Sequence, residues 1–257
     1  MTYALITGGS KGIGKAIAIE LAKKKINILL VSRSSTALQQ TAKEIKEQYG
    51  VETDYLATDL SLINAAENVF NWCNEKKYNI HILVNNAGYG LSGPFEKEPE
   101  VNNTNMMQLN MGTTVQLCHI FLPMLKQNNK GYILNIASSA AYQAVPFLSL
   151  YSASKSFVLN FSRGLSHELK NTNVSATCVS PGPTDTDFNT RAGLNEKATK
   201  AAEKFNVAPA AVAAVAVNAM FAGKREVITG FINKLSAFAA WLLPKNLIES
   251  AAVGIYK

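Results

Sequence analysis

The sequence predicts an α/β fold: a doubly wound parallel sheet of about seven strands, with helices on both faces. Short apolar runs alternate with long amphipathic segments along the chain, which is the rhythm of repeated strand–helix units. Most of the apolar runs have no polar face, which is typical of parallel strands covered by helices on both sides. No repeat, low-complexity segment or linker divides residues 1–257, so we expect a single domain.

The expected strands share a short run rich in Ile, Leu and Val, and they cover residues 3–7, 27–32, 51–57, 80–85, 132–138, 174–180 and 226–230. Helical patterns fill the intervals, for example over residues 11–25 and 34–50. The second of these begins at Ser34, a good N-cap residue, and ends at Gly50, a good C-cap residue. Strand and helix therefore alternate as a parallel sheet requires.

Composition excludes several classes of protein. Hydrophobic residues make up 47% and charged residues 17%, a globular balance. The net charge of +7 comes from scattered lysines without aromatic platforms, so we expect an anionic small ligand and no nucleic acid. The three cysteines have no metal-ligand spacing, which favours a reducing cytoplasm and no metal. The first residues lack a signal-peptide pattern, and no apolar run reaches the length of a spanning helix.

A glycine-rich loop connects the first expected strand to the first expected helix. TGGSKGIG (7–14) places Gly8, Gly12 and Gly14 where a tight turn lets backbone amides approach a pyrophosphate at a helix N-terminus. The spacing differs from G-x-G-x-x-G, so a purely structural turn remains an alternative. Its position after the first strand favours a Rossmann-type dinucleotide-binding site, to which the other loop residues Ser10, Lys11 and Ile13 also belong.

The end of the second strand predicts which dinucleotide is bound. An NAD site would place an acidic residue there for the ribose 2′-hydroxyl, whereas this chain has Ser32 and Arg33. An arginine can form a charge-assisted fork with a 2′-phosphate, and Lys11 would add a second cation. The alternative is that Arg33 is a solvated residue at a strand end. The combination of Arg33 with Lys11 favours NADP(H).

Tyr151 and Lys155 form the candidate catalytic pair. In the expected helix over residues 151–170, positions four apart share one face. An ammonium and an oxidised nicotinamide would both stabilise a phenolate, and lowering its pKa by about three units requires roughly 4 kcal/mol. Tyr and Lys at this spacing are a common accident on helices, so the pair taken alone favours packing over catalysis.

Further motifs reduce the weight of the packing alternative. NNAG (85–88) follows the fourth strand, and SPGPTDT (180–186) follows the sixth. LNMG contains Asn110, and IASS contains Ser138, thirteen residues before Tyr151. With these motifs in order, the chain resembles the short-chain dehydrogenase/reductase family along nearly its whole length. LNMGTTVQLCHIFLPML and SSAAYQAVPF resemble the branch near long-chain ketoacyl and steroid reductases.

The resemblance implies a catalytic set of four residues. Tyr151 protonates the carbonyl oxygen during reduction, and Ser138 donates a hydrogen bond to the same oxygen. Lys155 holds the nicotinamide ribose and lowers the pKa of Tyr151, while Asn110 positions a water for proton relay to Lys155. Ser139 is the rival of Ser138, but the spacing to Tyr151 favours Ser138.

The resemblance also implies cofactor contacts in the loops that follow the strands. Asp59 faces the adenine, and Thr186 contacts the nicotinamide carboxamide. The remaining members of this set lie beside them in the sequence: Leu60, Asn86, Ala87, Gly88, Pro181, Gly182 and Thr184.

Loops beyond the strand ends are expected to select the substrate. They are mostly apolar and comprise Tyr89, Leu91, Phe95, residues 143–147 and Phe188 onward. Apolar lining favours an apolar ketone or a ketoacyl compound over a sugar, unless these side chains only pack the loops. The predicted activity is NADP(H)-dependent hydride transfer between nicotinamide and a carbonyl or secondary alcohol, in either direction. The alternative is a non-catalytic NADP(H)-binding or redox-sensing protein.

The tail over residues 231–257 is apolar and carries Lys234 and Lys245 around an uncharged stretch. We expect a short helix over 235–243 that Pro244 ends. Its apolar face could cover the substrate pocket, contact another subunit or lie on a membrane surface, the last being least favoured. The family resemblance implies a homodimer or homotetramer assembled through the helix bearing Tyr151 and the helix before it.

Overall fold

The strands of the computed structural model, which describes residues 2–256, pair in parallel in the order β3-β2-β1-β4-β5-β6-β7. They span Thr2–Thr7 (β1), Asn27–Ser32 (β2), Thr53–Ala57 (β3), Asn79–Asn85 (β4), Gly131–Ile136 (β5), Val174–Ser180 (β6) and Glu226–Ile228 (β7). The predicted seven-stranded parallel fold is confirmed. The strand order reverses at β1, which opens a crevice between the loops after β1 and β4 at the carboxyl edge of the sheet.

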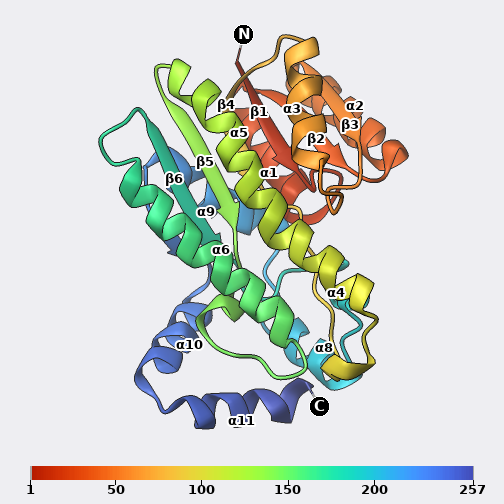
Figure 1. Ribbon diagram of the computed structural model, residues 1–257, viewed down its shortest axis with the longest axis vertical. Coiled ribbons are helices and arrows are strands. Elements are labelled where there is room, and N and C mark those ends of the chain that lie inside the picture. The colour runs from red at the N-terminus through yellow and green to blue at the C-terminus, as the bar shows by residue number, and fades with distance from the viewer. Residues whose placement is uncertain (1, 257) are drawn as a thin grey trace.

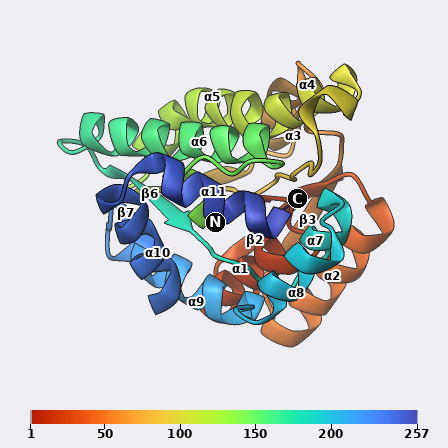
Figure 2. The same cartoon turned by 90° about the horizontal axis from the view of Figure 1, so that it is seen from below.

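Helices cover both faces of the sheet (Figure 1). One face carries α1 (Gly12–Lys23), α2 (Ser35–Tyr49) and α9 (Pro209–Phe221), and the other carries α3 (Ala65–Glu75), α5 (Thr113–Gln127) and α6 (Ser149–Glu168). Shorter helices lie toward the carboxyl edge: α4 (Glu100–Met107), α7 (Phe188–Ala192) and α8 (Glu196–Glu203). After β7 the chain continues through α10 (Phe231–Leu242) into α11 (Lys245–Tyr256), which crosses that edge (Figure 2).

Two apolar layers hold the helices against the sheet, and alternate side chains of β1 belong to different layers. Ile6 packs with Ile17 of α1 and Val217 of α9, whereas Leu5 belongs to the layer that contains Phe121 of α5. Ile6, Ile17, Leu5 and Phe121 are completely buried. Burying each such side chain contributes about 1.5–3 kcal/mol, so both layers fix the strands that carry the loops.

Local signals set several element ends as the sequence predicts. The Ser34 hydroxyl accepts a hydrogen bond from the Ala37 amide (3.3 Å), and Gly50 ends α2 in the left-handed region with φ 64°. The first helix ends earlier than expected, because Lys25 takes a positive φ of 63° and turns the chain into β2. Pro244 follows Leu243, the C-cap residue of α10.

Buried amides join the sheet to the helix that carries Tyr151. Asn85 Nδ2 at the end of β4 donates to Asn135 Oδ1 in β5 (2.9 Å). Asn135 Nδ2 then donates to the hydroxyl of Ser162 on α6 (2.9 Å). Buried amides that find partners fix one arrangement strongly, so α6 is held in register with the strand ends.

The terminal helices differ in how they pack. α11 contacts α8, and α10 contacts the 3₁₀ turn Ser139–Tyr142. Apolar side chains of α10 remain exposed, including Phe231 at 80% and Trp241 at 73% of their surface. Within residues 2–256, no helix combines the length and the hydropathy needed to cross a bilayer.

Candidate active site

The loops at the carboxyl edge of the sheet surround a cavity of about 960 Å³, a volume within the usual range of small-molecule sites. Its walls come from the loops after β1, β2, β3, β4, β5 and β6, from α6 and from α11. Every predicted site residue lines this cavity except Gly14 and Asn110. Those two lie directly behind its wall, against Gly8 and Gly88 respectively.

The glycine loop forms an open cradle at the start of α1. Gly8 and Gly12 adopt φ values of 65° and 57°, which side-chain-bearing residues rarely take. A side chain at Gly14 would collide with the carbonyl oxygen of Gly8. Within residues 2–256 no side chain caps α1, so its first amides are left without a side-chain partner, and Gly12 and Ile13 at this end line the cavity. The cradle therefore fits an anionic group that binds through backbone amides, as a dinucleotide pyrophosphate does.

Thr7 joins this cradle to the NNAG segment, a role that sequence reasoning missed. Its hydroxyl donates to the Val84 carbonyl (3.2 Å) and accepts from the amides of Asn86 and Ala87 (3.0 Å each). Asn86 Nδ2 in turn donates to the carbonyls of Thr7 (3.0 Å) and Gly8 (3.2 Å). The position of Thr7 at the last residue of β1 is the only sequence signal for this role.

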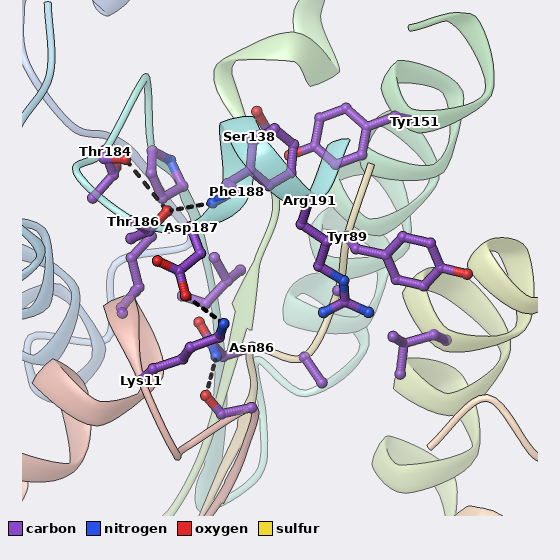
Figure 3. Close-up of a pocket in the computed structure, with 18 of the residues that line it drawn as sticks. Lys11, Asn86, Tyr89, Ser138, Tyr151, Thr184, Thr186, Asp187, Phe188 and Arg191 are labelled. Atoms are coloured by element: carbon purple, nitrogen blue, oxygen red, sulfur yellow. Dashed lines mark hydrogen bonds and ion pairs between the residues drawn. The ribbon is translucent and has the colours of Figure 1, made fainter. Parts of the chain in front are cut away.

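Lys11 forms an ion pair with Asp187 rather than pointing freely along the loop. The Nζ–Oδ2 distance is 2.5 Å, and both side chains are exposed. The hydrogen bond and charge of Lys11 lower the pKa of Asp187. The pair links the glycine loop to the start of α7 (Figure 3). Because it is exposed, solvent screens it and other anions can compete for the lysine.

Charged groups gather where the adenosine end of a dinucleotide would lie. Arg33 and Asp59 both line the cavity. Asp59 accepts hydrogen bonds from the Ser61 amide (2.9 Å) and hydroxyl (2.8 Å). Burial alone would raise the pKa of Asp59, but these bonds and the charges of Arg33 and Arg191 outweigh it and lower the pKa. Arg191, which was not predicted, reaches this group from α7.

Tyr151 and Ser138 face each other at another part of the cavity (Figure 3). Ser138 has an extended backbone at the start of the turn Ser139–Tyr142, and its hydroxyl accepts from the Ala140 amide (3.1 Å). The rival Ser139 also lines the cavity, but its amide donates to Pro181 (2.7 Å). Tyr151 lies on the first turn of α6 and is buried. A carbonyl oxygen placed between Tyr151 and Ser138 could accept from both.

The pKa of Tyr151 departs from the expectation. The resemblance implied a value lowered by Lys155, whereas burial raises the pKa of Tyr151 to about 12. A hydrogen bond with Ser138 acts in the opposite direction without overcoming burial. The reason is that desolvation penalises the phenolate more than one hydroxyl stabilises it. Tyr151 is therefore neutral at physiological pH and holds the proton that it would donate.

Lys155 lies one helical turn beyond Tyr151, at the floor of the cavity. Its Nζ donates to the Ile136 carbonyl (3.0 Å) and sits 5.9 Å from the centre of the Tyr151 ring. Only 5% of the residue is exposed, and burial lowers its pKa to about 8. At pH 7 Lys155 is mostly an ammonium ion that still has donors to offer a ligand.

Asn110 occupies a π-helical turn, Gln108–Gly112, between α4 and α5. Its Oδ1 accepts from the Tyr89 amide (3.1 Å), and its Nδ2 donates to the Tyr89 carbonyl (2.9 Å) and to Ser154 Oγ (3.0 Å). A Cβ added at Gly88 would lie 3.0 Å from Asn110 Oδ1 and 3.2 Å from Lys155 Nζ. The side chain therefore fixes the loop after β4 beside Lys155, and its place in a proton relay stays a prediction.

The wall beyond Tyr151 is mainly apolar. Phe188 lies with its ring centre 5.1 Å from that of Tyr151, and Leu91, Leu148 and Leu194 also line the cavity. Among the predicted specificity positions, Tyr89, Leu91 and Phe188 are part of the lining. Phe95 is not, because it points to solvent with 64% of its surface exposed. Residues 143–147 are also outside, held instead to Gly93 by the Phe147 carbonyl (2.8 Å).

The tail reaches the cavity through α11; the stretch 235–243, for which pocket cover was one of three expected uses, does not line it. Tyr256 lines the cavity, and its carbonyl accepts from Asn195 Nδ2 (3.0 Å). Ala252 packs in the same apolar cluster as Tyr151. Because α10 turns its apolar side chains outward, the cover comes from the last turns of the described chain.

Known proteins resemble this chain in sequence. A profile of the short chain dehydrogenase family matches residues 2–197. Over 185 residues the chain is 40% identical to a very-long-chain 3-oxoacyl-CoA reductase of Anas platyrhynchos, covering 70% of this chain and 58% of that protein. It is 36% identical over 181 residues to hydroxysteroid dehydrogenase-like protein 1 of Gallus gallus, covering 70% and 54%. The chain thus spans little more than half the length of these curated relatives.

Solved structures resemble it over nearly the full length. A short-chain dehydrogenase from Sphingobium yanoikuyae in complex with NADPH superposes with a TM-score of 0.82 at 26% identity, covering 99% of this chain and 94% of that one. A 7beta-hydroxysteroid dehydrogenase gives a TM-score of 0.88 at 24% identity, covering 98% and 96%, which shows the shared fold.

Proposed function

Because the chain belongs to the short-chain dehydrogenase family, we propose that it is an NADP(H)-dependent oxidoreductase acting on an apolar ketone or ketoacyl substrate and its secondary alcohol. The observation that carries this proposal is that Ser138 faces Tyr151 (Figure 3) and that Lys155 lies beside the Tyr151 ring, all three in the lining of the large cavity. Each of the three groups has a distinct task there.

Reduction of a carbonyl needs a hydride at carbon and a proton at oxygen. When bound, NADPH supplies the hydride. The substrate oxygen accepts hydrogen bonds from Tyr151 and Ser138, which oppose the charge that develops on it. Tyr151 then gives up its phenolic proton, forming the O–H bond of the alcohol. The Lys155 ammonium stabilises the phenolate that remains, and solvent restores the proton. Oxidation of an alcohol runs through the same groups in reverse.

The residues around the cavity fit the proposed cofactor. The glycine cradle and the N-terminus of α1 would hold the pyrophosphate, and Lys155 would bind the nicotinamide ribose. Arg33 at the end of β2 supports NADP(H), because a guanidinium matches a 2′-phosphate and no carboxylate occupies that strand end. Solved relatives include complexes with NADPH and with NAD, so the preference rests on Arg33.

The substrate class is proposed from the lining. Leu91, Leu148, Phe188 and Leu194 offer apolar surface and few hydrogen-bond donors. Such a wall favours an acyl chain or a bulky ketone over a polyhydroxy compound. The names of the similar reductases point to the same chemistry.

A non-catalytic NADP(H)-binding protein is the second candidate. It would need a dinucleotide cradle but would have no use for Tyr151 and Ser138 facing each other across the lining. The presence of that pair favours an enzyme.

A cytoplasmic location is also part of the proposal. Cys73, Cys118 and Cys178 are free and buried, and burial raises the pKa of each thiol to about 12. Such thiols are inert and suit a reducing compartment.

A substrate panel tests the proposal. Oxidation of NADPH is followed with 3-oxoacyl thioesters of increasing chain length, bulky ketones and a ketose, using Tyr151→Phe as the matched control. We expect turnover of the apolar compounds only, lost in the variant, with NADPH bound more tightly than NADH. Equal affinity for the two cofactors would overturn the NADP(H) preference. An inactive parent that still binds NADPH would favour the non-catalytic alternative.

A further inference from the structure

We propose that Arg191 on α7 is a second cation for the phosphate on the adenosine ribose of NADP(H), acting together with Arg33, which follows β2 and lines the same cavity. This inference rests on the proposed NADP(H) binding. It assigns Arg191 a task in cofactor selection, and it connects that selection to the helix that also carries Phe188 beside Tyr151.

The guanidinium of Arg191 is positioned by an aromatic ring (Figure 3). Its Cζ lies over the Tyr89 ring, 4.4 Å from the ring centre, and within residues 2–256 its N–H groups make no side-chain hydrogen bond, so they are available to a ligand. Tyr89 is itself held by Asn110, which bonds both its amide and its carbonyl. Arg191 therefore points into the cavity from a fixed support.

Arg33, Arg191 and Asp59 together carry a net positive charge, which favours binding of an anion. Arg33 and Arg191 lie close enough to repel each other, and the charge of Arg33, after desolvation, helps to lower the pKa of Arg191. Asp59 lies within range of both, but its carboxylate is bonded to Ser61. Within residues 2–256, neither arginine forms an ion pair with a carboxylate within 4.0 Å. Two guanidinium groups facing one shared carboxylate can bind a phosphate dianion between them.

Lys11 is the competing second cation, but a phosphate would have to displace the carboxylate that it already pairs with. Its ammonium pairs with Asp187 at 2.5 Å, near the start of α7. Arg33, Asp59 and Arg191 line the same cavity, and the charges of the two arginines, after the hydrogen bonds from Ser61, help to lower the pKa of Asp59. The 2′-phosphate would therefore be held between β2 and α7.

The position of Arg191 on α7 gives the contact a wider consequence. Phe188 stands three residues before it, against the Tyr151 ring. The Ala192 carbonyl accepts from the Ser92 amide (2.8 Å), so α7 is tied to the loop after β4. A phosphate that holds Arg191 would thus also hold Phe188 over the catalytic tyrosine.

Calorimetric titration with 2′,5′-ADP and 5′-AMP tests the inference, because these probes differ only in the 2′-phosphate. We expect Arg191→Met to weaken 2′,5′-ADP binding by roughly tenfold to a hundredfold, the range of a charge-assisted contact. Binding of 5′-AMP should change by less than about twofold, which also shows that the variant is folded. Arg191→Lys should recover part of the loss, since it keeps the charge without the fork.

Lys11→Met is the matched control, and it should leave the ratio of the two affinities unchanged. If Lys11→Met lowers that ratio and Arg191→Met does not, Lys11 is the second cation and the inference is wrong. If the parent protein binds both probes equally, the NADP(H) preference itself fails, and the inference fails with it. If the parent prefers 2′,5′-ADP and Arg191→Met shows the same preference, Arg191 has no role in phosphate binding. The NADP(H) preference itself would then still stand.

Discussion

At the scale of single residues, burial acts in opposite directions on the two ionisable groups of the candidate site. It raises the pKa of Tyr151 to about 12 and lowers that of Lys155 to about 8. Both shifts have the same cause, since a poorly solvated site disfavours the charged form of any group. Tyr151 thereby remains a proton donor over the physiological pH range. Lys155 beside it is the group whose pKa lies nearer to that range.

Ser138 and Ser139 offer a matched pair for testing which hydroxyl serves the substrate oxygen. We expect Ser138→Ala to lower kcat by about 10²–10³-fold, as removal of an oxyanion donor does. Ser139→Ala should change kcat by less than a few-fold, because it is the Ser138 hydroxyl that acts on the pKa of Tyr151. Steady-state kinetics on both variants measures this, and a larger loss in Ser139→Ala would reverse the assignment.

The shifted pKa of Lys155 predicts how stability depends on pH. In the folded protein its pKa is about 8, and in the unfolded chain it is the ordinary 10.5. Between these values the unfolded state binds more protons, so the group opposes folding fully below pH 8 and less as pH rises. Lys155→Met removes this effect. The free energy of unfolding of the variant minus that of the parent should fall by about 2 kcal/mol from pH 7 to pH 9.5.

Urea denaturation of both proteins at the two pH values checks this prediction. The lost hydrogen bond to Ile136 shifts the difference by a constant and leaves its pH dependence intact. A difference that does not change with pH would show that the pKa of Lys155 is not lowered.

At the scale of elements, apolar runs and glycines predicted most of the framework. The runs over 27–32 and 174–180 coincide with β2 and β6, because strands buried on both faces carry small or apolar residues and no charge. The glycine loop is recognisable for a similar reason, since its backbone conformation excludes side chains. These features depend on local sequence, which is why they can be read without a structure.

Other elements depend on contacts that no local pattern encodes. The π-helical turn that places Asn110 lies inside an unremarkable helical stretch. Arg191 is one charged residue on a five-residue helix. Its position in the cavity depends on contact with the ring of Tyr89, about a hundred residues earlier in the chain. The sequence also could not predict which way the apolar face of α10 points. An apolar stretch does not tell whether its face packs on its own domain, on another subunit or on a membrane.

Removal of α11 tests the tail as a cover for the substrate. Deleting residues 243–257 removes Tyr256 and Ala252 from the apolar wall beside Tyr151. It spares Asn233, which packs on Gly182 and bonds the Thr229 carbonyl (2.8 Å), so the cofactor loop keeps its support. We expect KM for an apolar ketone to rise about tenfold, the cost of losing one or two apolar contacts.

The dissociation constant for NADPH should remain within about twofold in the truncated protein, as measured by its fluorescence. Unchanged KM would show that α11 does not contact the substrate. Weakened NADPH binding with unchanged KM would place the tail at the cofactor instead.

At the scale of the whole molecule, the exposed apolar face of α10 predicts self-association. The rings of Phe238 and Trp241 lie 5.9 Å apart on this face, and the side chains are 55% and 73% exposed. So large a surface rarely stays open on a soluble monomer. We expect light scattering to give the mass of at least a dimer, and Trp241→Glu to lower it.

Ile63→Glu is the matched control, because Ile63 is 83% exposed but lies in a loop away from α10, and it should leave the mass unchanged. A monomeric parent would refute the prediction. Co-sedimentation of that monomer with anionic vesicles, lost in Trp241→Glu, would establish the membrane use of the tail. A lower mass for Phe157→Glu but not Trp241→Glu would place the contact on α6.

The most direct measurement of the central claim follows the hydride itself. The protein is incubated with an apolar ketone from the panel and NADPH that carries deuterium at the transferred position, and the alcohol is analysed by mass spectrometry. We predict deuterium at the former carbonyl carbon for the parent, and no alcohol for Tyr151→Phe, although that variant still binds NADPH. Alcohol formed without deuterium from either stereoisomer of the labelled cofactor would contradict hydride transfer, and undiminished alcohol from Tyr151→Phe would remove Tyr151 from the reaction.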